Sequence, residues 1–156
     1  MALAQARRRT LGGVVVLSLG ICFALAAANA GAPVFVPVTR ATLAWTHSIE
    51  KVRWEEDYEV RPSRSAADGA MLALVRARVH GSGAGMEPPP DAVLRNGWYE
   101  YRPATPPERE LLLVRSTFVA DYELCTDSGC RSLASFLPSD GGVTRMYACA
   151  RPHGPQ

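Results

Sequence analysis

The chain has 156 residues, enough for one domain, and its 47% hydrophobic and 21% charged content is that of an ordinary globular protein and excludes wholesale disorder. Three of its 17 basic residues, Arg7, Arg8 and Arg9, lie in the first thirty positions, which hold no acid, so 14 basic residues face 15 acidic ones in the remainder. A nearly neutral domain lacks the basic face that displaces counterions from nucleic acid, so we expect no nucleic-acid partner.

The three arginines precede a run without charge from Thr10 to Ala32, whose most apolar part is Leu11 to Ala28. No polar stripe interrupts this run, as it would on a core helix of that length. Basic residues before an apolar segment hold the N-terminus in the cytoplasm. We therefore expect residues 1–30 to be an export helix that delivers residues 31–140 to the extracytoplasmic side of the cell envelope.

Two fates of this export helix fit the sequence. A signal peptidase could cut after Ala30, because Ala28-Asn29-Ala30 is a small-residue cleavage site. Alternatively, the run is long enough to remain as a membrane anchor. Lipidation at Cys22 is disfavoured by the bulky Ile21 before it, so we take Cys22 as an apolar filler.

Beyond residue 30, several segments alternate between apolar and polar residues with a period of two, which is typical of strands. The predicted strands are Leu43–Ile49, Val52–Val60, Met71–His80, Gly97–Arg102, a long one from Leu111 to Cys125, and Arg131–Phe136. Prolines and glycines separate them, so we predict an all-β fold, a small antiparallel sandwich or open barrel. Residues 141–156 are expected to form a frayed C-terminal tail.

The loop between Val52–Val60 and Met71–His80 is too short for a crossover helix, so these two strands should pair antiparallel. The favoured register sets Glu56 opposite Arg76, Tyr58 opposite Leu74 and Val60 opposite Leu72, with Asp57 opposite Val75 and Glu59 opposite Ala73. A slip by one residue would instead set Glu55 or Asp57 against Arg76.

Two cysteines flank a turn sequence at Cys125-Thr126-Asp127-Ser128-Gly129-Cys130, which favours a hairpin with facing sulfurs. We predict a structural disulfide between Cys125 and Cys130; free thiols, a redox pair or a metal site are alternatives. Cys149 is left without an assigned role.

The segment Trp45 to Glu56 concentrates polar groups, and His47 and Glu50 could contribute to a ligand, metal or acid/base site. Their spacing matches no strong metal signature, so we assign no metal, no cofactor and no catalytic residue. Arg76 and Arg78 share a strand face, where they could form cross-strand ion pairs or bind an anion.

A glycine-rich stretch, His80-Gly81-Ser82-Gly83-Ala84-Gly85-Met86-Glu87, is followed by three prolines. A phosphate-binding loop is followed by a helix, and three prolines follow here instead. The sequence therefore does not support a phosphate-binding loop. Gly83, Gly85 and Glu87 remain candidates for contact with a ligand or partner, or for a crossover loop.

The runs WTHSIEKVRWEEDYEV, GSGAGMEPPP, GWYEY and VADYELCTDSGC resemble a bacterial family, the domain of unknown function 1850, over about residues 41–135. Members of that family are small exported or membrane-anchored proteins, often encoded beside TRAP-type transporter permeases that use TAXI-class binding proteins. The resemblance implies an envelope accessory to solute uptake and no known reaction.

We therefore expect a non-enzymatic periplasmic β domain, anchored in the membrane if residues 1–30 are not cleaved, that binds a TRAP-type permease or its substrate-binding protein. The alternative is a small-ligand or metal-binding protein that uses His47, Glu50, Arg76 and Arg78.

Overall fold

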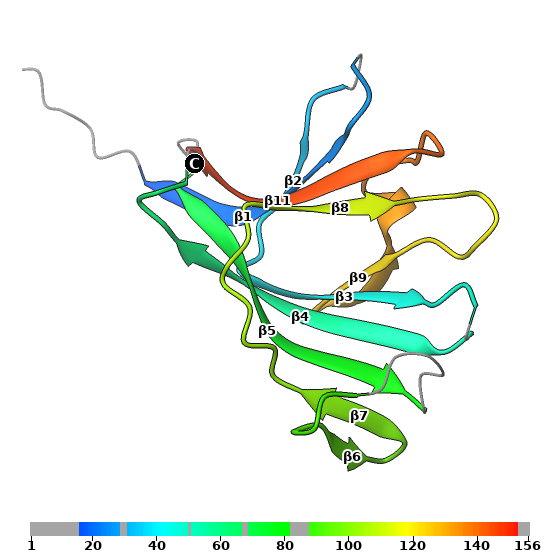
Figure 1. The fold of residues 1–156 in the computed structure, drawn as a ribbon. Coiled ribbons are helices and arrows are strands. Elements are labelled where there is room, and N and C mark those ends of the chain that lie inside the picture. The colour runs from blue at the N-terminus through cyan, green and yellow to red at the C-terminus, as the bar shows by residue number, and fades with distance from the viewer. Residues whose placement is uncertain (1–15, 29–30, 50, 67–68, 82–87, 153–156) are drawn as a thin grey trace, which may run out of the picture.

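The computed structural model describes residues 16–28, 31–49, 51–66, 69–81 and 88–152. Within these ranges the chain forms eleven strands and one short 3-10 helix, Leu133–Ser135, arranged as two antiparallel sheets (Figure 1). The predicted all-β class is confirmed. No helix in the described part of the chain is long and apolar enough to cross a membrane.

The larger sheet has seven strands and holds most of the segments whose alternation is visible in the sequence. In sheet order they are β10 (Gly129–Ser132), β9 (Glu123–Thr126), β3 (Arg40–Thr46), β4 (Arg53–Pro62), β5 (Ala70–His80), β7 (Trp98–Tyr101) and β6 (Val93–Arg95). The predicted strand from Leu111 to Cys125 is wrong in length, because it divides into β8 (Glu110–Val114) and β9 with a connection between them.

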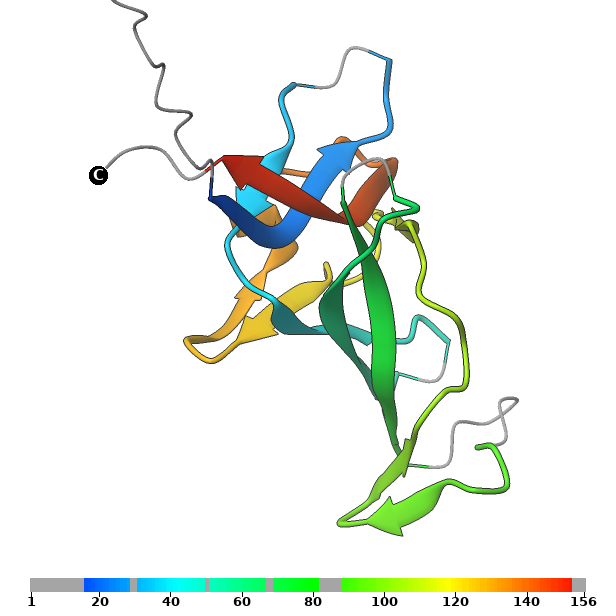
Figure 2. The same ribbon diagram turned by 90° about the vertical axis from the view of Figure 1, so that its left-hand side faces the viewer.

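The smaller sheet has four strands, in the order β2 (Val34–Val36), β1 (Leu17–Leu25), β11 (Val143–Pro152) and β8. It lies across the larger sheet (Figures 1 and 2). The apolar side chains between the two sheets form one core; Ile21, Phe23 and Met146 enter it from the smaller sheet, and Leu43, Tyr58 and Leu124 from the larger one.

The expected export helix is wrong over Leu17–Leu25, which forms a strand instead. β1 pairs with β11 on one side and β2 on the other, and Ile21 and Phe23 are fully buried in the core. A strand buried on both faces reads as a continuous apolar run, so hydropathy alone does not separate it from a helix. Residues 1–15 and the small-residue cleavage site at Asn29-Ala30 lie outside the described residues.

The expected C-terminal tail also differs from the structure, since Val143–Pro152 forms β11 in the middle of the smaller sheet. Its partners β1 and β8 are far away in sequence, and pairing of this kind leaves no local signal.

The predicted antiparallel pairing of β4 with β5 is confirmed, but a bulge splits its register. Tyr58 faces Leu74 and Val60 faces Leu72, as the favoured register requires. Between Asp57 and Tyr58 the register shifts, so that Asp57 faces Arg76 and Glu56 faces Ala77, and Val75 is the extra residue. A bulge of this kind re-aims the side chains beyond it. Arg76 therefore pairs on the face opposite to Glu56.

Candidate functional site

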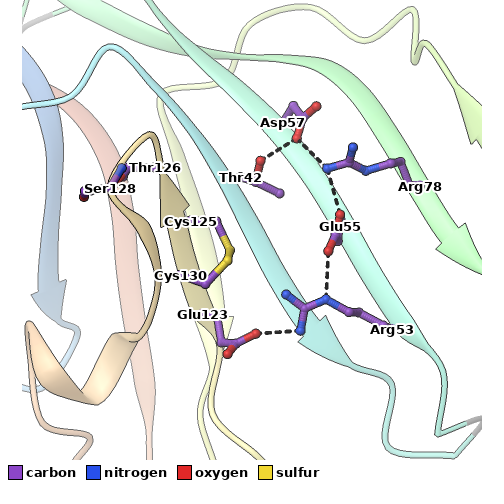
Figure 3. The surroundings of a disulfide bond; sticks show 10 residues. All are labelled: Thr42, Arg53, Glu55, Asp57, Arg78, Glu123, Cys125, Thr126, Ser128 and Cys130. Carbon is purple, nitrogen blue, oxygen red and sulfur yellow. Dashed lines mark hydrogen bonds and ion pairs between the residues drawn. A yellow bond between two sulfur atoms is a disulfide. The ribbon is translucent and has the colours of Figure 1, made fainter.

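The outer face of the larger sheet, which points away from the smaller sheet, carries a continuous network of ion pairs (Figure 3). Arg53 bridges Glu55 at 2.7 Å and Glu123 at 2.6 Å, and Arg78 bridges Glu55 at 2.7 Å and Asp57 at 3.4 Å. Arg76 also bonds Asp57 at 2.6 Å, and the Thr42 hydroxyl donates to the same carboxylate at 2.6 Å.

The sequence leaves open whether Arg76 and Arg78 form cross-strand ion pairs or bind an anion. Both guanidinium groups contact carboxylates from β4, so they take part in cross-strand ion pairs. Their positive charge is balanced by neighbouring acids, which leaves little attraction for an external anion.

The inner face of the same sheet, which points toward the smaller sheet, carries one acid in an apolar row. The residues directly opposite one another across five strands are Leu124, Leu43, Glu56, Ala77 and Tyr101. Leu124, Leu43 and Ala77 are buried, and the small side chain of Ala77 lies between Glu56 and Tyr101. Glu56 is thus a partly buried carboxylate among apolar and phenolic groups.

Tyrosines surround this carboxylate. The Tyr58 hydroxyl donates to Glu56 Oε2 at 2.6 Å. Burial is the main reason that the pKa of Glu56 is raised; the Tyr58 hydrogen bond opposes this shift, and the charge of nearby Glu108 adds to it. Burial and the Glu56 charge also raise the pKa of Tyr101 and Tyr122. Tyr101 lies on the same inner row as Glu56, with Ala77 between them.

Glu56 and Glu108 differ from the acids of the outer face in their partners. Among the described residues, no ion pair joins Glu56 or Glu108 to a basic group, whereas Glu55, Asp57 and Glu123 all contact arginines. We call Glu56, Tyr58, Tyr101, Tyr122 and Glu108 the inner acid site. Glu56 is partly buried and Glu108 is exposed, and neither has an ion-pair partner within the described chain.

A cleft of about 430 Å³ adjoins this site at one end of the molecule. Residues at the end of β3 form one wall, and residues after β8 form the other; the lining is Trp45, Thr46, His47, Ser48, Val114, Arg115, Ser116, Val119, Ala120, Asp121 and Tyr122. We call it the end cleft. Tyr122 belongs to both places, and its ring lies 5.8 Å from that of Trp45.

His47 lies in the end cleft and stacks on Trp54, with ring centroids 5.5 Å apart. Trp54 and Glu55 are consecutive on β4, so their side chains point to opposite faces of the sheet. His47 therefore lies on the inner side, whereas Arg78 contacts Glu55 on the outer side. The structure does not bring His47 together with Arg76 and Arg78.

The remaining candidates lie outside the described residues: Glu50, Gly83, Gly85 and Glu87. Within the described ranges, no group of three or more histidine, cysteine, aspartate or glutamate side chains could hold a metal ion.

Both pairs of cysteines are bonded. Cys125 and Cys130 are directly opposite across the β9–β10 hairpin and form the predicted disulfide (Figure 3). Cys149 bonds to Cys22, across 127 residues of sequence. The interpretation of Cys22 as an apolar filler is therefore wrong, because the pairing of β1 with β11 was not visible in the sequence.

Several large apolar side chains are exposed around the end cleft and β8. Leu112 and Val114 of β8 are 63% and 67% exposed, and Phe118 in the following connection is 95% exposed. Ile49, in the turn after β3, is also exposed. Large exposed apolar side chains occur on interaction surfaces when they lie close together.

Sequence reasoning missed the inner acid site. Alternation did place Glu56 on one face with Trp54, Tyr58 and Val60, but the favoured register gave it Arg76 as a partner. Only the bulge at Val75 removes that partner, and Glu108 and Tyr122 come from distant connections.

An open two-sheet β domain with one partly buried carboxylate, Glu56, on the inner face of its larger sheet defines the structural class of this protein. The chain belongs to the family described as a domain of unknown function, DUF1850, whose model matches residues 41–133. That region runs from β3 to the short 3-10 helix, so β1, β2 and β11 lie outside it. No curated protein sequence and no solved structure matches the chain.

Proposed function

We propose that this chain is a non-enzymatic accessory that binds a component of a TRAP-type solute uptake system on the extracytoplasmic side of the cell envelope. Membership of the DUF1850 family supports the uptake system through the resemblance described above. Two observations carry partner binding. Glu56 is a partly buried carboxylate without a basic partner among the described residues, and Leu112, Val114 and Phe118 are exposed apolar side chains on and after β8.

The two disulfides support the proposed compartment. Disulfides persist in oxidising compartments such as the periplasm and are rare in the cytosol. Because β1 belongs to the fold, a test of location should use the whole chain. A full-length fusion to a reporter that is active only in the periplasm should be active, and activity confined to a cytoplasmic reporter would contradict the proposed location.

Co-purification tests the proposed partner. A tagged chain is purified from detergent-solubilised membranes under non-reducing conditions, and the bound proteins are identified by mass spectrometry. We expect a TRAP-type permease or its binding protein to be enriched over an untagged strain. If both are absent although the tagged chain is folded, the proposal fails.

A second candidate function is small-ligand binding in the end cleft. Its volume of about 430 Å³ lies in the range of small-molecule sites, and Trp45, His47 and Tyr122 supply aromatic walls. Native mass spectrometry of the purified chain would show a bound molecule that is lost in a His47→Ala variant. A spectrum of the bare chain alone would favour the accessory role.

A further inference from the structure

The side of β8 that faces away from β11 is an open sheet edge. The Arg115 N–H donates to the Gly142 carbonyl of the β11 side at 2.9 Å. Because the backbone N–H and C=O groups of successive residues in a strand point to opposite sides, this bond fixes the direction of the backbone groups in β8. Leu111 and Leu113 direct their backbone groups toward β11, and Glu110, Leu112 and Val114 direct theirs toward the open edge. Among the residues that the structure describes, β8 pairs only with β11 along its length.

The open edge begins where the two sheets touch. Glu108 and Leu72 exchange backbone hydrogen bonds of 2.7 and 2.9 Å just before β8 starts. Beyond that bridge the sheets diverge, and Figure 1 shows β8 at the border of the smaller sheet, across from β3 and β4. A strand beside β8 would therefore lie over the open side between the sheets.

Beyond Glu110, this short edge lacks the charge, proline or bulge that often prevents strand addition. Residues 111–114 contain no charge, no proline and no bulge. The outward side chains Leu112 and Val114 are apolar and exposed, and Phe118 follows in the next connection. An extended peptide would satisfy the open backbone groups and cover these side chains.

The charges of the open side favour a basic occupant. Alternate side chains of an added strand would point between the sheets, as buried Leu113 does. There they would approach Glu56, which has no basic partner among the described residues, and the half-buried rings of Tyr101 and Tyr122. Glu108, which also has no basic partner there, is exposed just before β8 begins. A carboxylate beside aromatic rings suits a lysine or arginine side chain.

We propose that an extended segment of the partner protein adds as an antiparallel or parallel strand to the open edge of β8 and directs a lysine or arginine side chain to Glu56. This inference rests on the proposed function for the existence of a partner, and it names the surface and the chemistry of the segment. The bulge at Val75 serves this role, because it turns Arg76 away from Glu56.

Peptide display tests the recognition directly. Random twelve-residue peptides are displayed on phage and selected on the purified, oxidised full chain. We expect enrichment of sequences with apolar residues at alternate positions and one lysine or arginine at a fixed position. No enrichment, or enriched sequences without a basic residue, would overturn the proposal.

Two variants assign the binding to this edge. Leu112→Pro removes an N–H that points away from β11, so the existing ladder stays intact and strand addition is blocked; Leu112→Ala is the matched control. Val114→Pro repeats the test if Leu112→Pro fails to fold.

The variant Glu56→Gln tests the charge. It should weaken the affinity for the selected basic peptides about thirtyfold or more, while it retains the Tyr58 hydrogen bond. Peptide binding that is unchanged in these variants would contradict the proposal.

The same variants separate this inference from the proposed function. If uptake components still co-purify with folded Leu112→Pro and Glu56→Gln chains, the partner binds elsewhere and the inference fails while the function stands. Sedimentation of the full chain as a dimer that Leu112→Pro dissociates would identify a second copy as the occupant, which also overturns the inference.

Discussion

Glu56 and its neighbours Glu55 and Asp57 are consecutive acids on β4, yet their surroundings differ. Glu55 and Asp57 point outward and contact arginines, whereas Glu56 points inward beside Tyr58. Acids that serve stability are normally paired when buried. Glu56 has a hydrogen-bond partner in Tyr58 but no basic partner among the described residues, as the proposed recognition of a basic segment requires.

Glu56→Gln tests this distinction through pH. Because burial raises the pKa of Glu56, the folded chain favours its protonated form. That stabilisation is full below the ordinary glutamate pKa of 4.5 and is lost as pH rises through the folded-state pKa. We expect the Gln variant to be at least as stable as the native chain at pH 7 and to lose that advantage below pH 4.5. Thermal unfolding across pH measures the difference, and a Gln variant that is less stable at pH 7 would give Glu56 a structural role.

Arg115 is the opposite case, a charge whose role is structural. It is 2% exposed and bonds Asp121 at 2.7 and 2.8 Å, the Leu137 carbonyl at 2.9 Å and the Thr144 hydroxyl at 3.2 Å. Burial acts to raise the pKa of Asp121, but the Arg115 bond and charge outweigh it and lower the pKa.

Arg115→Met should leave Asp121 without its partner and destabilise the fold by about 3–5 kcal/mol. Urea unfolding measures the loss, and the double variant Arg115→Met with Asp121→Asn should recover part of it. A loss below about 1 kcal/mol would contradict the structural role.

At the scale of elements, alternation located the strands that have one polar face. β3, β4, β5 and β7 show it because the outer face of the larger sheet carries charges and the inner face carries apolar groups. The middle of β1 is covered on both faces, so it shows no alternation. In β11 the burial alternates, but Thr144 is a buried polar residue and Tyr147 a half-buried apolar one, so the sequence does not show it. The bulge at Val75 had no sequence signal either, since neither glycine nor proline marks it, and so the residues of the inner acid site could not be grouped in advance.

The burial of β1 in the core predicts that the fold requires residues before Gly31. A chain that begins at Gly31, as cleavage after Ala30 would produce, lacks the buried side chains Ile21 and Phe23 and leaves Cys149 without Cys22. We expect this truncated chain to lose cooperative thermal unfolding, whereas the full chain retains it. A cooperative transition with native circular dichroism in the truncated chain would show that β1 is dispensable.

At the scale of the whole molecule, the two disulfides close loops of very different length. The Cys125–Cys130 bond links residues five apart, within a hairpin that already forms by local pairing. The Cys22–Cys149 bond links residues 127 apart and joins the two ends of the described chain. Because the unfolded chain loses more freedom when a longer loop is closed, the second bond should contribute more stability.

Chain-entropy estimates give about 2 kcal/mol for the short loop and about 5 kcal/mol for the long one. Denaturant unfolding of the variants Cys125→Ser with Cys130→Ser and Cys22→Ser with Cys149→Ser should reproduce this order. Equal losses, or a larger loss for the hairpin bond, would contradict the view that the long bond holds the two-sheet fold together.

Site-specific photo-crosslinking in the living cell tests the central claim most directly, namely that the open side beside β8 receives a partner of the uptake system. A photoreactive amino acid replaces Leu112 in one strain and Arg131, on β10 at the far border of the larger sheet, in another. We predict a crosslinked product with a TRAP-type permease or binding protein from position 112 and none from position 131. Crosslinks to that component from position 131 alone, or none from position 112 in a folded chain, would contradict the account.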